Sequence, residues 1–262
     1  MNRENRSKKY IIIIVFILLI TLGVIGYFLF GSFADSGVEE QLSSGVGVSS
    51  VEKNTSSKSK ASKKPDNPID FKKLHKQNDE IVAWIIIPDT KINYPILQSR
   101  VADDFYLHRD VNKNSSYAGS IYMEYCNSDE FTDRVTVLYG HNMINGSMFA
   151  NLHKFEDKSF FDSKKHRYFY VYTPDRKLTY QVVSAYVYDD RHIMNSFNFA
   201  ENSVFKSYLK DVTNPRSYTK NVRKLERKLT LDDRILTLST CLNSGDGRYL
   251  LQGVLEKDEF TG

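Results

Sequence analysis

The sequence predicts a mainly β domain, folded as a closed antiparallel barrel or a sandwich, behind an N-terminal transmembrane helix. Three observations support this prediction. An uncharged apolar run occupies residues 10–30, a stretch rich in Ser, Gly and Lys follows it, and short β-branched segments fill most of the remainder. Eight short strands, most without an intervening helix, are typical of closed or two-layered β folds.

The N-terminal segment has the properties of a membrane anchor. About 20 apolar residues cross a hydrocarbon core of about 30 Å as a helix, and residues 10–30 carry no charge. Four cations against Glu4 give the first nine residues a charge of +3. The positive-inside rule therefore predicts a cytoplasmic tail at 1–9 and an exported remainder. A cleaved signal peptide is the alternative, although its apolar core would span only about 7–15 residues.

Residues 31–66 are expected to form a flexible linker, and residues 67–262 one extracellular domain. Large apolar side chains are scarce in the linker, so it can bury too little surface to offset its chain entropy. The domain opens with a short helix that extends to about Asn78. Asn67 is the expected N-cap, Pro68 the first helical residue and Asp70 an early acid.

Eight strands and two further helical segments are expected in the domain. Turn residues such as Pro88-Asp89-Thr90 separate the β-branched runs. A short helix is expected at 147–152, and a longer one at 204–212, where apolar residues recur at helical spacing and predict one buried face. The strands are expected at 81–87, 92–97, 119–123, 134–139, 167–173, 178–188, 234–238 and 249–255.

Charge and cysteine content restrict the classes of partner. The net charge is +4, and the first nine residues account for +3 of it. A nearly neutral remainder argues against nucleic acid, which requires a concentrated basic face.

The two cysteines, Cys126 and Cys241, are too few for a disulfide scaffold and form no metal-binding motif. We expect no metal and no other cofactor.

Cys241 is the best candidate for chemistry. It ends an apolar, β-branched segment and precedes a loop rich in Gly, Asn and Asp, so its thiol would be partly exposed on a rigid element. A free cysteine has a pKa of about 8.5, and its reactive thiolate needs a cationic neighbour. His141 ends another apolar strand, and a hairpin would return Arg248 beside Cys241. A guanidinium there can stabilise a thiolate and an oxyanion.

Several motifs together resemble the sortase family, and in detail its class B. They are Tyr-Gly-His-Asn-Met at 139–143, Gly-Ser-Met-Phe at 146–149, and Leu-Ser-Thr-Cys at 238–241 with an arginine downstream. Ala-Trp-Ile-Ile-Ile-Pro at 83–88 and Tyr-Pro-Ile at 94–96 are also similar to that family's opening strands. The resemblance spans roughly residues 69–255. It implies a closed eight-stranded barrel with a helix inserted before the cysteine strand, where the segment 204–212 lies.

The resemblance also implies a cysteine transpeptidase. A sortase thiolate attacks the threonine carbonyl of a C-terminal sorting motif in a secreted protein, and a peptidoglycan-precursor amine resolves the thioester. Carried over by motif, Cys241 is the nucleophile, His141 the general acid and base, and Arg248 the stabiliser of oxyanion and substrate. Ser239 and Thr240 are candidate substrate-binding residues. The protein would act at the outer face of the cell membrane, with nucleic acid excluded as a partner.

Two other functions stay open at this point. One is a different cysteine enzyme, either a peptidase or an L,D-transpeptidase, although the Ser-His-Gly-Cys-type motif of the latter is absent. The other is a non-catalytic, membrane-tethered β-barrel binding module, in which Cys241 would be buried and inert. Cys126 is expected to be a loop thiol. The other five histidines are expected at the surface or in turns; they are His75, His108, His153, His166 and His192.

Overall fold

The structure is a computed structural model that describes residues 64–243 and 245–262. The expected cytoplasmic tail, the anchor at 10–30 and all but the last three residues of the expected linker lie outside these ranges. Within them, none of the helices has the length and apolarity that a bilayer span requires.

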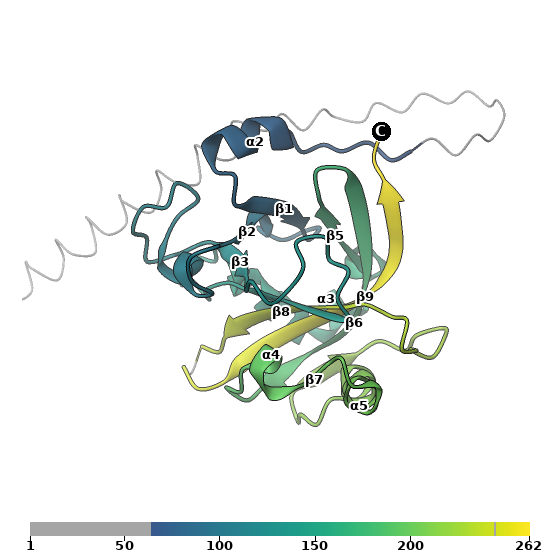
Figure 1. Cartoon of the computed structure of the whole chain (residues 1–262). Helices are drawn as coiled ribbons and strands as arrows, with labels where there is room; N and C mark the ends of the chain where they lie inside the picture. Colours follow the sequence, from purple (N-terminus) through teal and green to yellow (C-terminus); the bar gives the residue numbers. More distant parts are fainter. Residues whose placement is uncertain (1–63, 244) are drawn as a thin grey trace, which may run out of the picture. The chain divides into compact units, whose positions relative to one another are not determined.

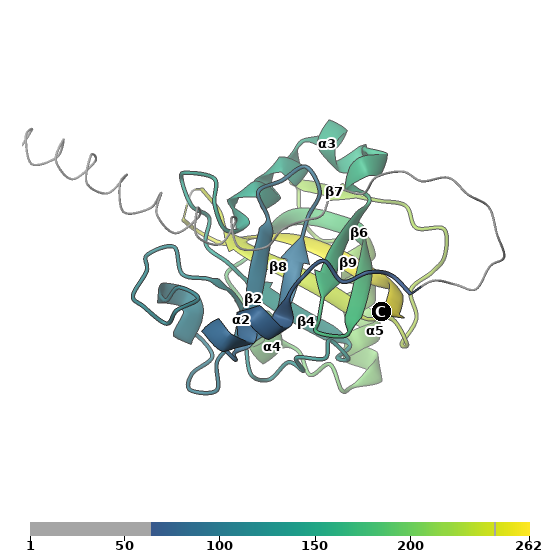
Figure 2. The ribbon, with the colours of Figure 1, turned by 90° about the horizontal axis from the view of Figure 1, so that it is seen from above.

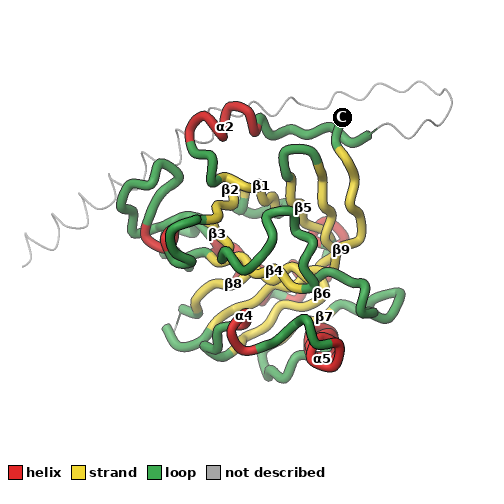
Figure 3. Tube along the Cα trace, in the orientation of Figure 1, coloured by secondary structure: helices red, strands yellow, loops and turns green. Residues whose placement is uncertain are grey.

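Eight strands close into a barrel (Figures 1 and 3). Their order around the barrel is β5-β1-β2-β3-β4-β8-β9-β6, and β6 pairs again with β5. All eight expected strands are confirmed, and β8 extends as far as Cys241. The strands are β1 (Ile81–Ile86), β2 (Asn93–Gln98), β3 (Ile121–Met123), β4 (Val135–Tyr139), β5 (Tyr168–Tyr172), β6 (Arg176–Tyr188), β8 (Ile235–Cys241) and β9 (Arg248–Phe260).

A further strand, β7 (Lys220–Val222), extends the sheet beyond the barrel by pairing with β6. No pattern in the sequence predicts this strand. A three-residue strand with only one β-branched residue carries no detectable alternation, so only its pairing with Ser184–Tyr186 identifies it.

Two neighbouring strand pairs run parallel, so the expectation of an antiparallel arrangement is wrong for them. β2 pairs with β3 and β4 pairs with β8 in this way. Parallel neighbours require a long crossover connection, and residues 140–234 provide it between β4 and β8. Side-chain patterns identify strands but do not reveal their direction. Because β4 and β8 are parallel, their C-terminal ends lie at the same end of the barrel.

Two apolar clusters stabilise the fold. One fills the barrel, where Phe169 stacks on Tyr180 at 5.4 Å between ring centroids. Gly253 allows this packing, since a Cβ added there would lie 2.6 Å from the Phe169 ring. The other cluster lies between the outer barrel surface and the predicted long helix, observed as α5 (Asn202–Thr213). Its buried face carries Phe205, Tyr208, Leu209 and Val212, as expected.

The remaining helices are short and lie in the connections. They are α2 (Phe71–Gln77), η1 (Phe105–His108), η2 (Phe149–Glu156), α3 (Lys158–Asp162), η3 (Lys164–His166) and α4 (Ile193–Ser196), and Figure 2 shows α3 and α4 on different sides of the barrel. The helix expected at 147–152 is the 3₁₀ helix η2, which begins and ends later.

The expected N-cap of the first helix is wrong. Asp70, not Asn67, caps α2, and its Oδ1 accepts a hydrogen bond from the Lys73 N–H at 3.0 Å. The Asn67 side chain instead donates to the Thr173 carbonyl at 2.9 Å. Asn67 therefore fastens the start of the domain to the end of β5, and Pro68 precedes the helix rather than opening it.

Candidate active site

His141 and Cys241 leave neighbouring parallel strands at the same end of the barrel. Tyr139 of β4 is in register with Ser239 of β8. The contact continues beyond β4, because the Gly140 N–H donates to the Ser239 carbonyl at 3.2 Å and the Thr240 hydroxyl donates to the Gly140 carbonyl at 2.8 Å. The residue after Gly140 is His141, and the residue after Thr240 is Cys241.

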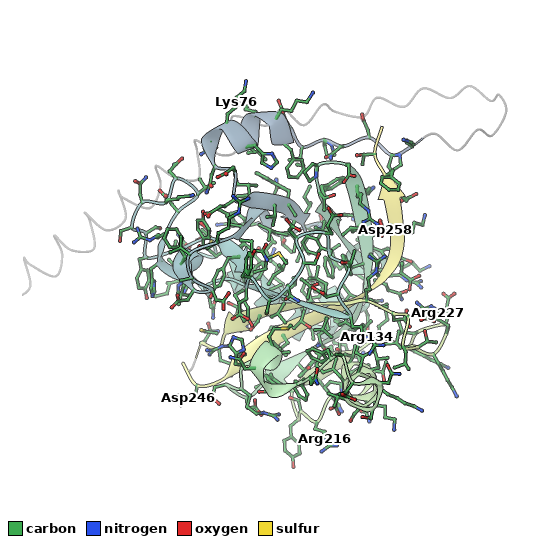
Figure 4. The ribbon with its side chains drawn as sticks, in the orientation of Figure 1. Lys76, Arg134, Arg216, Arg227, Asp246 and Asp258 are labelled. Atoms are coloured by element: carbon green, nitrogen blue, oxygen red, sulfur yellow. The ribbon has the colours of Figure 1, made fainter. Side chains whose placement is uncertain are left out.

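Arg248 lies opposite Cys241 across the β8–β9 hairpin, where the two residues are paired. Gly247 makes the return possible, with φ of 90° and with a position for Cβ only 2.7 Å from the Tyr188 carbonyl oxygen. Asp246 lies at the outer end of this loop (Figure 4). The expected hairpin that brings Arg248 beside Cys241 is thus confirmed.

The His141 imidazole is half-buried and hydrogen-bonded. Its Nε2 lies 2.9 Å from the Leu107 carbonyl oxygen, which can only accept, so Nε2 carries the proton. The ring stacks against Tyr117 and lies 5.5 Å from the His108 ring. Burial lowers the pKa of His141, the hydrogen bond to Leu107 opposes this effect, and His108 adds to it. The lowered pKa favours the neutral imidazole, in which Nδ1 is the nitrogen that can accept a proton.

The Cys241 thiol is free and partly exposed. In the described ranges, no hydrogen bond joins its sulfur to the His141 ring or the Arg248 guanidinium; Arg248 Nη1 instead donates to the Gly247 carbonyl at 3.1 Å. The buried thiol expected of an inert binding module is not what the structure contains. Cys126 is also free and lies in an exposed loop, as expected.

The side chains of Ser239 and Thr240 are buried, at 4% and 2% exposure. The Thr240 hydroxyl is used internally in its bond to Gly140. Neither residue presents an exposed surface here, and their substrate-binding role stays a prediction.

An aromatic and ionic group beside the site escaped the sequence analysis. Tyr122, the middle residue of β3, stacks on Tyr139 at 5.4 Å, and Tyr139 stacks on His192 at 5.9 Å. His192 Nε2 lies 2.5 Å from Glu124 Oε1. This pair joins the insertion before β7 to the barrel. His192 was expected at the surface, and that expectation is only partly correct, because its side chain is 38% exposed.

The pKa values of Tyr122 and Glu124 are both raised, chiefly by burial. The charges of Glu124 and Asp104 raise the pKa of Tyr122 further, and the charge of Arg248 opposes them. The predicted strand that ends at Met123 could have pointed to Tyr122 within it and to Glu124 just after it. His192 is the N-cap of the short helix α4, and no sequence pattern shows that this helix brings it to Glu124.

Asn142 and His153 are further neighbours of the nucleophile that sequence reasoning did not assign. The Asn142 amide donates to the Cys241 carbonyl at 3.0 Å, and His153 Nε2 lies 3.1 Å from the same oxygen. The expectation that His153 is a surface or turn residue is therefore wrong. The described part of the chain contains no cluster of three or more His, Cys, Asp or Glu side chains that could hold a metal ion.

Comparison with known proteins agrees with this geometry. The model of the sortase domain matches residues 85–256. Sortase B of Listeria monocytogenes is 39% identical over 193 residues, which cover 71% of this chain and 74% of that protein. Sortase B of Staphylococcus aureus is 32% identical over 171 residues, or 65% and 67% of the two chains.

Solved structures share the barrel as well. Sortase B from B. anthracis in complex with AAEK1 superimposes with a TM-score of 0.62 and 36% identity, over 71% of this chain and 84% of that one. Clostridium perfringens sortase B gives a TM-score of 0.64 and 30% identity, over 72% and 100%. The family model covers well over half of the sequence, and the chain belongs to the sortase family, in its class B.

Proposed function

We propose that the chain is a membrane-anchored class B sortase in which Cys241, His141 and Arg248 are the catalytic residues. As a sortase B, it is a cysteine transpeptidase that links secreted proteins to the cell wall. The observation that carries the assignment of residues is their convergence. Parallel strands bring His141 and Cys241 to one end of the barrel, and the hairpin pairs Cys241 with Arg248.

The proposed first half-reaction forms a thioester. The Cys241 sulfur attacks the threonine carbonyl carbon of the sorting motif, and its proton moves to Nδ1 of His141. The carbonyl oxygen becomes an oxyanion, which the Arg248 guanidinium stabilises with several fixed donors. Collapse of this intermediate breaks the peptide bond, and the leaving amine takes the proton from His141.

The second half-reaction reverses these roles. An amine of a peptidoglycan precursor attacks the thioester carbonyl and gives a proton to His141. The Cys241 sulfur leaves and takes this proton back from His141, and the new amide bond joins the secreted protein to the precursor. A neutral resting His141, as its lowered pKa implies, supports its role as the first proton acceptor. Hydrogen bonds between catalytic groups commonly tighten only when the substrate is bound. This accounts for a Cys241 sulfur that is not hydrogen-bonded to His141 or Arg248.

The proposal includes the placement of the domain. Residues 1–9 would be cytoplasmic, 10–30 the transmembrane anchor, 31–66 the linker, and 67–262 the extracellular catalytic domain. The uncharged run after four cations supports this arrangement. Alkaline extraction of membranes tests it: the full chain should stay with the membrane, and a chain lacking residues 1–30 should be released.

The catalytic assignment is tested with sorting-motif peptides. We expect Cys241→Ala to abolish cleavage of a panel of threonine-containing peptides, whereas Cys126→Ala should retain it. Mass spectrometry should detect the acyl-enzyme on the wild-type chain and on Cys126→Ala only. Cleavage that persists in Cys241→Ala would remove Cys241 from the mechanism.

An amine acceptor separates transfer from hydrolysis. A transpeptidase should form the amide product when a peptidoglycan-derived amine is added, with less hydrolysed peptide. A product mixture that does not change on adding the amine would instead favour the peptidase alternative.

A further inference from the structure

His153 contacts the two strands that carry Cys241 and Arg248. Its Nε2 lies 3.1 Å from the carbonyl oxygen of Cys241, at the end of β8. Its ring stacks on Tyr249 of β9 with centroids 4.9 Å apart and an interplanar angle of 25°. Tyr249 is the next residue after Arg248. One imidazole thus touches the backbone of the nucleophile and the side chain next to the arginine.

Two further side chains complete this arrangement. Glu156 contacts the opposite edge of the imidazole, with Oε1 2.5 Å from His153 Nδ1. Asn142, the residue after His141, donates to the Cys241 carbonyl at 3.0 Å and to the Asn243 side chain at 2.8 Å. We call Asn142, His153 and Glu156 the carbonyl clamp.

The carbonyl clamp acts at the end of β8, where pairing with β4 has already ended. The last β4–β8 pair is Tyr139 with Ser239, whereas Cys241 is still paired with Arg248 of β9. Side-chain contacts with the Cys241 carbonyl therefore supplement the backbone pairing at this end of the strand. The Asn142 amide nitrogen also lies 3.2 Å from His153 Nε2, so the two side chains that reach the Cys241 carbonyl contact each other as well.

We propose that His153 is a positioning residue for the transpeptidation reaction. By holding the Cys241 carbonyl and packing on Tyr249, it fixes the nucleophile relative to Arg248, while Asn142 links the same carbonyl to the segment of His141. The inference rests on the proposed function of Cys241. Small displacements of a reacting group reduce rates greatly, since about 1 Å of misplacement costs on the order of a hundredfold.

Two substitutions of His153 separate its two hydrogen bonds. In His153→Gln the amide nitrogen occupies the place of Nε2 and keeps a donor for the Cys241 carbonyl. In His153→Asn the amide nitrogen occupies the place of Nδ1, so the contact with Glu156 is kept and the one with Cys241 is lost. We expect His153→Asn to lower kcat about tenfold with KM within about twofold, and His153→Gln to recover most of that loss.

His166 provides the matched control. It also has two occupied ring nitrogens, with Nδ1 2.8 Å from the Phe160 carbonyl and Nε2 3.0 Å from Asp89 Oδ2, and it stacks on Phe160. His166→Asn should lower the melting temperature at least as much as His153→Asn does, and should leave kcat within about twofold of wild type. This comparison separates positioning from a general loss of stability.

The full chain is assayed in two ways. Turnover is measured with a sorting-motif peptide that the wild type cleaves, and alkylation of Cys241 by iodoacetamide is measured by mass spectrometry with Cys126 as internal reference. We expect the ratio of the Cys241 rate to the Cys126 rate to fall several-fold in His153→Asn and to stay at the wild-type value in His166→Asn.

The outcomes are distinct. Equal kcat values for His153→Asn and His153→Gln, or a loss in His166→Asn as large as that in His153→Asn, would overturn the proposal. So would failure of both His153 variants to fold at a temperature where His166→Asn is folded, because His153 would then serve stability. If Cys241→Ala retained activity, the proposed function would fail instead, whatever the alkylation ratio of the His153 variants.

Discussion

At the scale of single residues, the environment of His141 determines when it can carry charge. Burial lowers its pKa, the Leu107 carbonyl partly offsets this, and His108 repels the charged form. A histidine with a lowered folded-state pKa binds more protons in the unfolded chain. Its contribution to stability is therefore complete above the unfolded-state value of about 6.5 and is lost as the pH falls through the folded-state pKa.

This predicts a specific titration. The imidazole of His141, followed by NMR, should titrate below the ordinary range of histidine, because the neutral ring is favoured by burial. His108→Gln removes one repelling neighbour and should raise the pKa of His141. A wild-type midpoint at or above about 6.5 would contradict the lowered pKa.

Arg248 is predicted to be irreplaceable by another cation. Arg248→Lys keeps the positive charge opposite Cys241 but replaces a planar fork of donors with a single ammonium, so we expect a loss of most activity, on the order of a hundredfold in kcat. The measurement is peptide cleavage at saturating substrate. Arg216→Lys, at an exposed site, is the control and should be neutral. Wild-type turnover in Arg248→Lys would exclude the proposed role.

At the scale of elements, α5 is the structural support of the crossover between β4 and β8. Phe205 is fully buried between the helix and the outer barrel surface, and the Arg134 guanidinium lies 5.3 Å from its ring centroid. Phe205→Ala should reduce the free energy of unfolding by about 3–5 kcal/mol, measured by urea denaturation. Lys206→Ala, on the exposed face of the same helix, should change it by less than about 0.5 kcal/mol. Similar effects of the two substitutions would contradict this account of α5.

The elements also show what a sequence alone can predict. All eight barrel strands were predictable because β-branched runs end at clear turn residues, and α5 because Phe205, Tyr208 and Val212 keep helical spacing. The parallel direction of β4 and β8 was not predictable, since it depends on how a crossover of nearly a hundred residues is routed. The N-cap failed for a local reason: Asn67 forms a long-range bond that its sequence neighbours do not reveal.

In the candidate site, too, some residues are predictable from local sequence patterns and others are not. Cys241, His141 and Arg248 could be proposed because each lies at or just beyond the end of a strand, and His141 and Cys241 stand in recognisable motifs. Asn142 and His153 could not be assigned, because their contact with the Cys241 carbonyl depends on how the segment from 142 to 156 packs against the end of β8. Local patterns identify reactive groups, whereas the groups that position them depend on tertiary packing.

At the scale of the whole domain, an ionic cluster fastens the end of β9 to the barrel. Asp258 accepts hydrogen bonds from Arg176 of β6 and from Arg234, just before β8, with Oδ2 2.7 Å from Arg234 Nη2. Figure 4 shows Asp258 on the part of β9 toward the C-terminus. All three side chains are largely buried, at 17–25% exposure. One carboxylate thus joins three strand regions that are distant in the sequence.

Removing this charge should weaken the closure of the barrel. Asp258→Asn leaves two partly buried guanidinium groups without a counter-charge, and we expect a loss of about 2 kcal/mol in the free energy of unfolding. Asp162→Asn, which breaks an exposed pair with Lys158, should cost less than about 1 kcal/mol. Urea denaturation of both variants measures the difference, and equal losses would refute the importance of the cluster.

The parallel pairing of β4 with β8 has a consequence for the newly made polypeptide. His141 and Cys241 are separated by a hundred positions, and everything between them must be routed around the barrel before the two strands can meet. Contacts so distant along the chain are slow to form during folding. Until this pairing forms, Cys241 lacks its neighbour His141, although the local β8–β9 hairpin can already place Arg248 beside it. The proposed nucleophile and its proposed base therefore come together late, after the crossover between their strands is in place.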